Sequence, residues 1–152
     1  MANSQAMCTS FKQDLFNGLH AFGTSVVRGT TAADSFKAAL YLVSGSLGAG
    51  TTAYSATSEV SGTGYTAGGT AITSWNAPTT SGTSAYTTPT ASFAWTTVTL
   101  STAFDTVLVY NNTASGKNAV SVHTFGSQTI TAGNFTLTMP TNAAGTALLQ
   151  IS

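Results

Sequence analysis

The stretch that decides the fold class is "VLVYNNTASGKNAVSVHTFG", residues 107–126. Two runs of β-branched, apolar and aromatic residues flank the polar segment "NTASGK" at residues 112–117. Paired runs of this kind, joined by a few residues that include glycine and asparagine, are typical of an antiparallel β-hairpin. The stretch therefore predicts two adjacent antiparallel strands and is the clearest hairpin in the chain.

Outward from this hairpin, other runs are also typical of short strands. In "SFKAALYLVSG", residues 35–45, alternation places Phe36, Ala38, Leu40 and Leu42 on one face. The remaining runs are residues 70–78, 91–100, 103–111, 128–133, 134–140 and 146–152, with the runs at 128–133 and 134–140 paired around Gly133 and Asn134. About seven to nine short strands at this spacing predict an all-β fold, an antiparallel β-sandwich or jelly roll.

A glycine cluster, "SGTGYTAGG", occupies residues 61–69. Its spacing fits neither the dinucleotide-binding pattern nor the phosphate-binding loop, and a strand-like run follows it instead of a helix. We expect these glycines to supply positive φ at a tight connection, with Tyr65 packed back onto the core.

The N-terminal segment changes to helical periodicity. Ser10 with Gln13 matches a capping box, and Gly23 suits the position just past a helix end. This predicts one amphipathic helix from about Phe11 to Phe22, in an N-terminal arm and helix at residues 1–34 that precede a β-sandwich domain at residues 35–152.

Five apolar residues share one face of that predicted helix, and they are our candidate assembly interface: Phe11, Leu15, Phe16, Leu19 and Phe22. A single helix with so much apolar surface must lie on another surface. That surface is either a partner subunit or the β-domain of the same chain, and the sequence leaves both open.

Charge is scarce in this chain of 152 residues, since only 5% of residues are charged and the net charge is zero, against about 25% charged in an ordinary domain. The basic residues are scattered, which argues against nucleic-acid binding: Lys12, Arg28, Lys37 and Lys117. A net charge near zero promotes association, so we expect one domain that works inside a larger assembly.

Cys8 is the only cysteine, so neither an internal disulfide nor a cysteine metal cluster is expected. The first ten residues lack the features of a secretory signal, and no apolar run reaches about 20 residues. We expect synthesis in a reducing cytoplasm and no membrane partner.

Residues suited to catalysis are few. Glu59 and Asp105 are the one carboxylate pair that we considered for acid–base work; Asp14 in the first helical turn and Asp34 beside a strand have structural explanations. His20 and His123 accompany no serine-nucleophile motif and are too few for an ordinary zinc set. We therefore expect no enzyme activity and no cofactor or metal.

Aromatic residues allow a different function, a flat sugar-binding platform that includes Trp75, Tyr86 or Trp95. Trp95 alternates in step with Phe93, however, which indicates a shared buried face. Core packing is the favoured interpretation of the tryptophans.

Four blocks of the chain resemble a family of small virion structural proteins of tailed bacteriophages. They are "FKQDLFNGLHAFG", "SFKAALYLVSG", "TTAYSATSEVSGTGYTAGG" and "VLVYNNTASGKNAVSVHTFGSQTITAGNFTLTMP". The third block, at residues 51–69, is the most specific. The resemblance implies a β-rich particle component that occurs in many copies, without enzymatic activity or ligand-binding residues to carry over.

Together these features favour a capsid cement or decoration protein, made in the host cytoplasm and located in the virion. Its expected partners are the major capsid protein and copies of itself, as a dimer or trimer. A tail or baseplate component and a glycan-binding adhesion module remain the alternatives.

Overall fold

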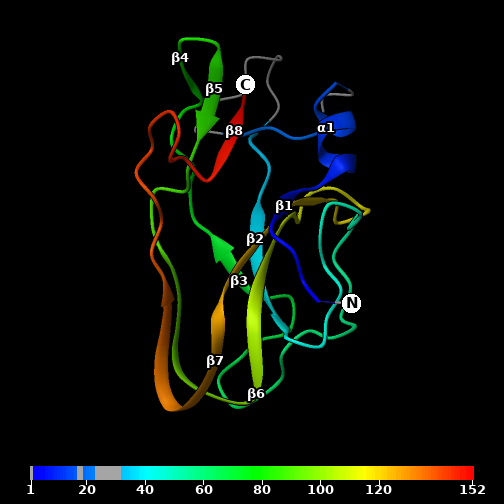
Figure 1. Cartoon of the computed structure of the whole chain (residues 1–152), viewed down its shortest axis with the longest axis vertical. Coiled ribbons are helices and arrows are strands. Elements are labelled where there is room, and N and C mark those ends of the chain that lie inside the picture. Colours follow the sequence, from blue (N-terminus) through cyan, green and yellow to red (C-terminus); the bar gives the residue numbers. More distant parts are fainter. Residues whose placement is uncertain (1, 17–18, 23–31) are drawn as a thin grey trace.

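The computed structural model describes residues 2–16, 19–22 and 32–152 and is nearly all β. Its described strands form two antiparallel sheets (Figure 1). The elements in chain order are β1 (Ala6–Met7), α1 (Thr9–Phe16), β2 (Phe36–Leu42), β3 (Thr70–Ile72), β4 (Thr79–Ser81), β5 (Ser84–Thr87), β6 (Phe93–Asn111), β7 (Ala119–Leu137) and β8 (Leu149–Ile151).

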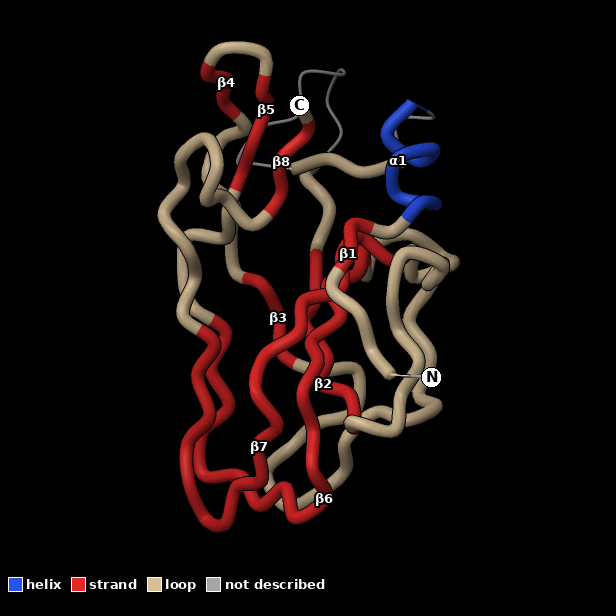
Figure 2. Tube along the Cα trace, in the orientation of Figure 1, coloured by secondary structure: helices blue, strands red, loops and turns tan. Residues whose placement is uncertain are grey.

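The larger sheet has the strand order β1-β7-β6-β2-β3, and the smaller one has the order β4-β5-β8. In Figure 2 the smaller sheet lies at one end of the long axis of the molecule, the end that also carries α1. None of the helical structure in the described residues reaches the length and apolarity that crossing a bilayer would require.

The hairpin predicted at residues 107–126 is confirmed as the junction of β6 and β7, where Val109 pairs with Ser121 and Tyr110 with Ala119. The prediction that all strands are short is wrong, because β6 and β7 have 19 residues each. The runs at 91–100 and 103–111 belong to one strand. The runs at 128–133 and 134–140 likewise continue β7, and Gly133 pairs with Val98 of β6 rather than turning a hairpin of its own.

Register shifts allow β6 and β7 to stay paired along their whole length although the ribbon bends. The pairing of β6 with β7 slips at several points between Trp95 and Thr106. Such irregularities bend and twist a ribbon without ending its pairing. Figure 2 shows the ribbon turning back on itself at the end of the molecule opposite α1.

The bend brings the two halves of the β6–β7 ribbon together around aromatic side chains. The Phe135 ring lies 5.0 Å from the Phe104 ring and 5.4 Å from the Phe125 ring, centroid to centroid. Phe135 is also paired with Trp95, at 5.8 Å between rings. One part of the core is therefore built between two lengths of the same hairpin.

Strand β2 is confirmed and lies antiparallel to β6 and β3. Both of its faces are buried: Phe36, Ala38 and Leu40 on one, Ala39 and Tyr41 on the other. Other parts of the chain therefore cover both faces of β2.

The helix predicted from Phe11 to Phe22 is wrong in its extent. Helix α1 ends at Phe16, and residues 19–22 are not helical. The Leu19 N–H donates to the Asp14 carbonyl, five residues back, at 2.9 Å, a pattern found where helices end. Ser10 Oγ lies 3.4 Å from the Thr51 carbonyl, so its hydroxyl holds a loop instead of forming the predicted capping box, while Gly23 lies outside the described residues.

Candidate functional site

The acidic side chains are the most informative polar groups of the structure. Each of the four accepts hydrogen bonds from its own chain and thereby fastens a loop or the N-terminal segment to the larger sheet: Asp14, Asp34, Glu59 and Asp105. A carboxylate whose lone pairs accept hydrogen bonds from its own chain stabilises the fold.

Glu59 organises the long loop between β2 and β3. Its carboxylate accepts from the Tyr54 hydroxyl at 2.7 Å, the Tyr65 hydroxyl at 2.8 Å and the Gly68 N–H at 2.7 Å. The Tyr65 hydroxyl also accepts from the Leu40 N–H of β2 at 3.0 Å. Burial, together with the neighbouring carboxylate, raises the pKa of both tyrosines well above their ordinary value, so both remain donors at neutral pH.

The glycine cluster is confirmed as a turn. Gly64, Gly68 and Gly69 have positive φ, the conformation that glycine adopts at no steric cost. A side chain at Gly69 would collide with the Ala38 carbonyl oxygen of β2. The Tyr110 hydroxyl donates to the Gly68 carbonyl at 2.8 Å and closes the turn over β6.

Asp105 fastens the N-terminus. Its Oδ1 accepts from Asn3 Nδ2 at 2.9 Å and from the Thr106 hydroxyl at 2.7 Å, while Asn3 Oδ1 accepts from the Leu47 N–H at 2.9 Å. Glu59 and Asp105 thus belong to separate networks. In the described parts of the chain no set of three or more His, Cys, Asp and Glu side chains is arranged to hold a metal ion.

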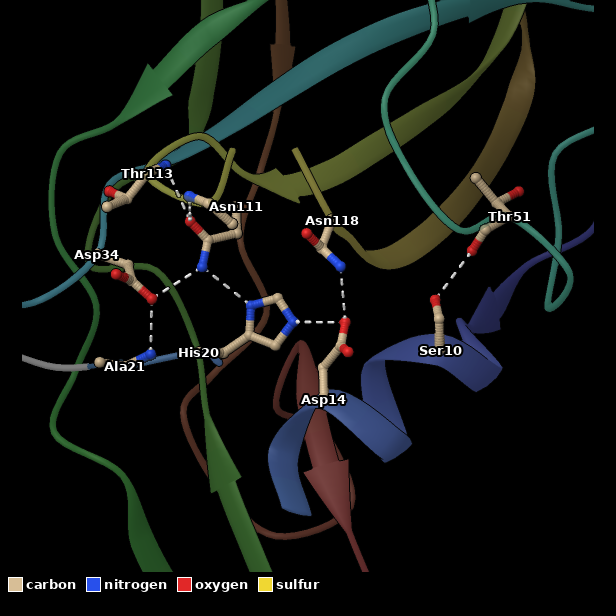
Figure 3. A network of polar contacts seen from close by, with 10 residues as sticks. Ser10, Asp14, His20, Ala21, Asp34, Thr51, Asn111, Thr113 and Asn118 are labelled. Atoms are coloured by element: carbon tan, nitrogen blue, oxygen red, sulfur yellow. Dashed lines mark hydrogen bonds and ion pairs between the residues drawn. The ribbon is translucent and has the colours of Figure 1, made fainter. Parts of the chain in front are cut away.

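A third acidic network, around Asp14 and Asp34, joins the N-terminal segment (α1 and residues 19–22) to the end of the β6–β7 hairpin (Figure 3). Asp14 of α1 accepts from Asn118 Nδ2 at 3.1 Å and lies 3.5 Å from His20 Nε2. Asn111, at the end of β6, contacts His20 Nδ1 at 3.1 Å and donates to Asp34 Oδ2 at 2.8 Å. This network connects α1, His20 and the segment before β2 to the two sides of the hairpin loop between β6 and β7.

The orientation of Asn111 determines the protonation of His20. Asn111 Oδ1 accepts the N–H groups of Thr113 and Ala114 at 2.9 and 3.0 Å, so its Nδ2 must face the ring. Since Nδ2 only donates, His20 Nδ1 accepts and the ring is neutral, with its proton on Nε2. Burial lowers the pKa of His20, although Asp14 and Asp34 oppose this shift.

The other histidine, His123, contacts Ser121 Oγ through Nε2 at 2.8 Å. Burial lowers the pKa of His123 to about 4. Ser121 is fully buried, so this pair does not present a nucleophile to a substrate.

The structure places the five predicted interface residues differently from one another. Phe11 is buried, and Phe22 stacks on Phe36 at 4.6 Å and contacts Trp75 at 4.9 Å, centroid to centroid. These two therefore pack on their own chain, as in the alternative arrangement. Leu15 is partly buried against the core and Leu19 is 38% exposed, whereas the side chain of Phe16 lies outside the described residues.

An apolar groove that the sequence did not reveal lies between the N-terminal segment and the smaller sheet. Its volume is about 260 Å³, and its walls include Leu15, Phe22, Tyr86, Leu149 and Ile151. These residues come from both ends of the chain and from β5, so only the three-dimensional fold brings them together. Ile151 is 49% exposed.

The favoured interpretation of the tryptophans, core packing, is confirmed, and the alternative sugar platform is not available to them. Trp75 and Trp95 are buried in the core, as the alternation of Trp95 with Phe93 indicated. Neither offers a ring face to a ligand, which leaves only Tyr86, in the wall of the groove.

Comparisons of this chain with protein-family models, with curated proteins and with solved structures find no match.

Proposed function

We propose that this chain is a non-enzymatic structural protein of a bacteriophage virion, most specifically a capsid cement or decoration protein. The observation that carries the proposal is the use of all four carboxylates as internal fastenings of loops to the sheet. In an enzyme, acid–base groups face a substrate site; here these groups face their own chain.

The resemblance to small virion proteins supports the same proposal. Its most specific block, residues 51–69, forms the loop that Glu59 holds against β2. A near-neutral surface also suits close packing beside many copies of one partner, because no long-range repulsion opposes it. Its partners would be the major capsid protein and further copies of this chain, as a dimer or trimer, in the virion.

We further assign the architecture to the sandwich or jelly-roll class, in which the folded ribbon supplies two layers. The support is the contact of Phe135 with Phe104 and Phe125 across the bend.

We place the contact with the coat at the end of the molecule that carries α1 and the groove. Leu19 and Ile151 are two of the three large apolar side chains exposed in the described residues, and the third is Val43, which is 40% exposed. Ile151 lines the groove and Leu19 precedes His20, which also lines it. Weak contacts of this kind, repeated over several coat subunits, give strong total binding.

Substitution of the exposed residues tests this placement. Leu19→Asp and Ile151→Asp are each expected to reduce binding to undecorated capsids at least roughly tenfold, since a charge cannot be desolvated cheaply in an apolar contact. Val43→Asp, a matched change at another exposed apolar residue, is expected to bind normally. Equal binding by all three variants would contradict the placement.

Copy number in purified particles tests the function itself. Quantitative mass spectrometry is expected to find this chain in hundreds of copies per virion, comparable with the coat protein. A few to a few dozen copies would favour a tail or baseplate component, and absence from the particles would overturn the proposal.

A further inference from the structure

The buried hydrogen bond between His20 and Asn111 depends on the protonation state of the His20 ring. The ring lies among aromatic side chains, 4.9 Å from the Phe11 ring and 6.3 Å from the Phe36 ring. Its Nε2 lies 3.5 Å from Asp14 Oδ2 and has no partner in normal hydrogen-bond geometry. Its single good hydrogen bond is the one that Nδ1 accepts from Asn111.

That hydrogen bond exists only while the ring is neutral. A proton on Nδ1 would face the Asn111 Nδ2 donor at 3.1 Å. The amide cannot turn over to offer its oxygen, because Oδ1 holds two backbone N–H groups of the hairpin loop and Nδ2 is held by Asp34. Protonation therefore replaces an attractive contact with an opposed pair of donors.

The charged groups that face the ring do not remove this effect. Among the described residues they are Asp14 from α1 and Asp34 from the segment before β2. Asp14 already accepts from Asn118, and Asp34 already accepts from Asn111 and from the Ala21 N–H. Both carboxylates attract a charged ring, but burial among aromatic rings opposes the charge more strongly and leaves the pKa of His20 lowered.

The ring also sits where the N-terminal segment, here α1 and residues 19–22, contacts the rest of the molecule. Phe22, two residues after His20, stacks on Phe36 and meets the Trp75 ring edge to face. The Ala21 N–H donates to Asp34 and the Asp34 N–H to the Ala21 carbonyl, at 2.9 and 3.2 Å. Loss of the His20 contact is therefore expected to weaken the whole attachment.

We propose that His20 and Asn111 form an acid-sensitive latch: the neutral ring holds the N-terminal segment on the sheet, and protonation releases the segment and uncovers Phe36 and Trp75. The latch is independent of the proposed virion function. In the released segment His20 takes up a proton near its ordinary pKa of about 6.5. The opening equilibrium constant then rises roughly tenfold for each pH unit below that value, until the pKa of the docked ring is reached.

Hydrogen exchange of two amides measures this opening. The Leu19 and Ala21 amides are bonded within the latch region, and the Leu42 amide, bonded to the Ser58 carbonyl, reports on the sheet. In the full chain carrying His123→Gln, so that His20 is the sole histidine, exchange is followed by NMR from pH 8 to pH 5 and corrected for intrinsic rates. Protection of Leu19 and Ala21 is expected to fall below about pH 6.5, by up to roughly tenfold per pH unit, without a parallel fall at Leu42.

Two further measurements can contradict the latch proposal. Adding His20→Gln is expected to abolish the pH dependence, whereas a steep fall that persists without the imidazole would refute it. In the chain that retains His20, the nitrogen chemical shifts of the His20 ring are expected to show the Nε2–H tautomer at pH 8. An Nδ1–H tautomer, or full protonation at pH 6.5 with the segment still protected, would contradict the proposal even if the variants failed to fold.

Discussion

At the scale of single residues, Glu59 and Gly69 show how one loop is held on β2. Glu59 supplies the acceptor for three donors of the loop, and Gly69 allows the backbone to lie against Ala38. The positive φ of this glycine was predictable from the clustered glycines in the sequence. Its contact with Ala38 was not, because the two residues meet only after β2 and the loop have paired.

Substitution of Gly69 is expected to be severe. Gly69→Ala combines a positive φ of 74° with a clash against β2, whose Ala39 Cα would lie 2.6 Å from the new Cβ, so we expect a loss of about 3–5 kcal/mol or failure to fold. Gly82→Ala is the matched control, because its φ is 58° and no atom lies within 4 Å; it should cost about 1–2 kcal/mol. Urea unfolding compares the two, and equal losses would show that the close approach to β2 is unimportant.

Removal of the Glu59 carboxylate is expected to loosen the loop. Glu59→Ala leaves two tyrosine hydroxyls and the Gly68 N–H without their acceptor, and a loss of about 2–4 kcal/mol follows from such unpaired groups. Glu59→Gln keeps one amide oxygen as an acceptor and should lie between the wild type and the alanine variant. Stability of the alanine variant within about 0.5 kcal/mol of the wild type would contradict the fastening role.

At the scale of elements, the folded ribbon of β6 and β7 distinguishes this molecule from a simple series of hairpins. The alternating pattern identified the hairpin, β2 and most of β6 and β7, but not β1, β4 or β5, which lie outside the predicted runs. It did not reveal the bend, since register shifts and the contact of Phe135 with Phe104 depend on residues 31 positions apart. The error in the helix prediction is similar: Phe22 stacks on Phe36 from residues 19–22, which are not helical.

The ribbon contact can be tested by truncating its central ring. Phe135→Ala removes contacts with Phe104, Phe125 and Trp95 and is expected to cost about 3–5 kcal/mol. Thr136→Ala, at the exposed neighbouring position, should change stability by less than about 1 kcal/mol. Denaturant unfolding distinguishes them, and a Phe135 variant as stable as the Thr136 variant would argue against the folded ribbon.

The polar network of the N-terminal segment was beyond sequence reasoning for the same physical reason. Asp14 and Asn118 are separated by 104 positions, and His20 and Asn111 by 91. Neither pair belongs to a local motif. The five-residue apolar face was visible from its spacing, but which members turn toward their own chain depended on where α1 ends.

At the scale of the whole molecule, the two histidines make stability depend on pH. The pKa of His123 is lowered to about 4 and that of His20 is lowered from 6.5, so the unfolded chain binds more protons than the folded chain between about 4 and 6.5. Stability therefore falls as the pH falls through this window. We expect the free energy of unfolding to be about 1–2 kcal/mol lower at pH 5.5 than at pH 7.5.

The control for this prediction is His123→Gln, which should reduce the difference between the two pH values without removing it. Chemical denaturation at both pH values measures the effect. Equal or greater stability at pH 5.5 would show that the histidines are not held in the neutral form.

A molecule with few charges, internally engaged carboxylates and exposed apolar residues at one end is suited to holding other subunits together. A cryo-EM reconstruction of the virions proposed to contain this chain tests that claim most directly. It should show this fold on the outer shell, bridging neighbouring coat subunits, with Leu19 and Ile151 toward the coat. A complete particle map in which no copy of this fold touches the coat would contradict it.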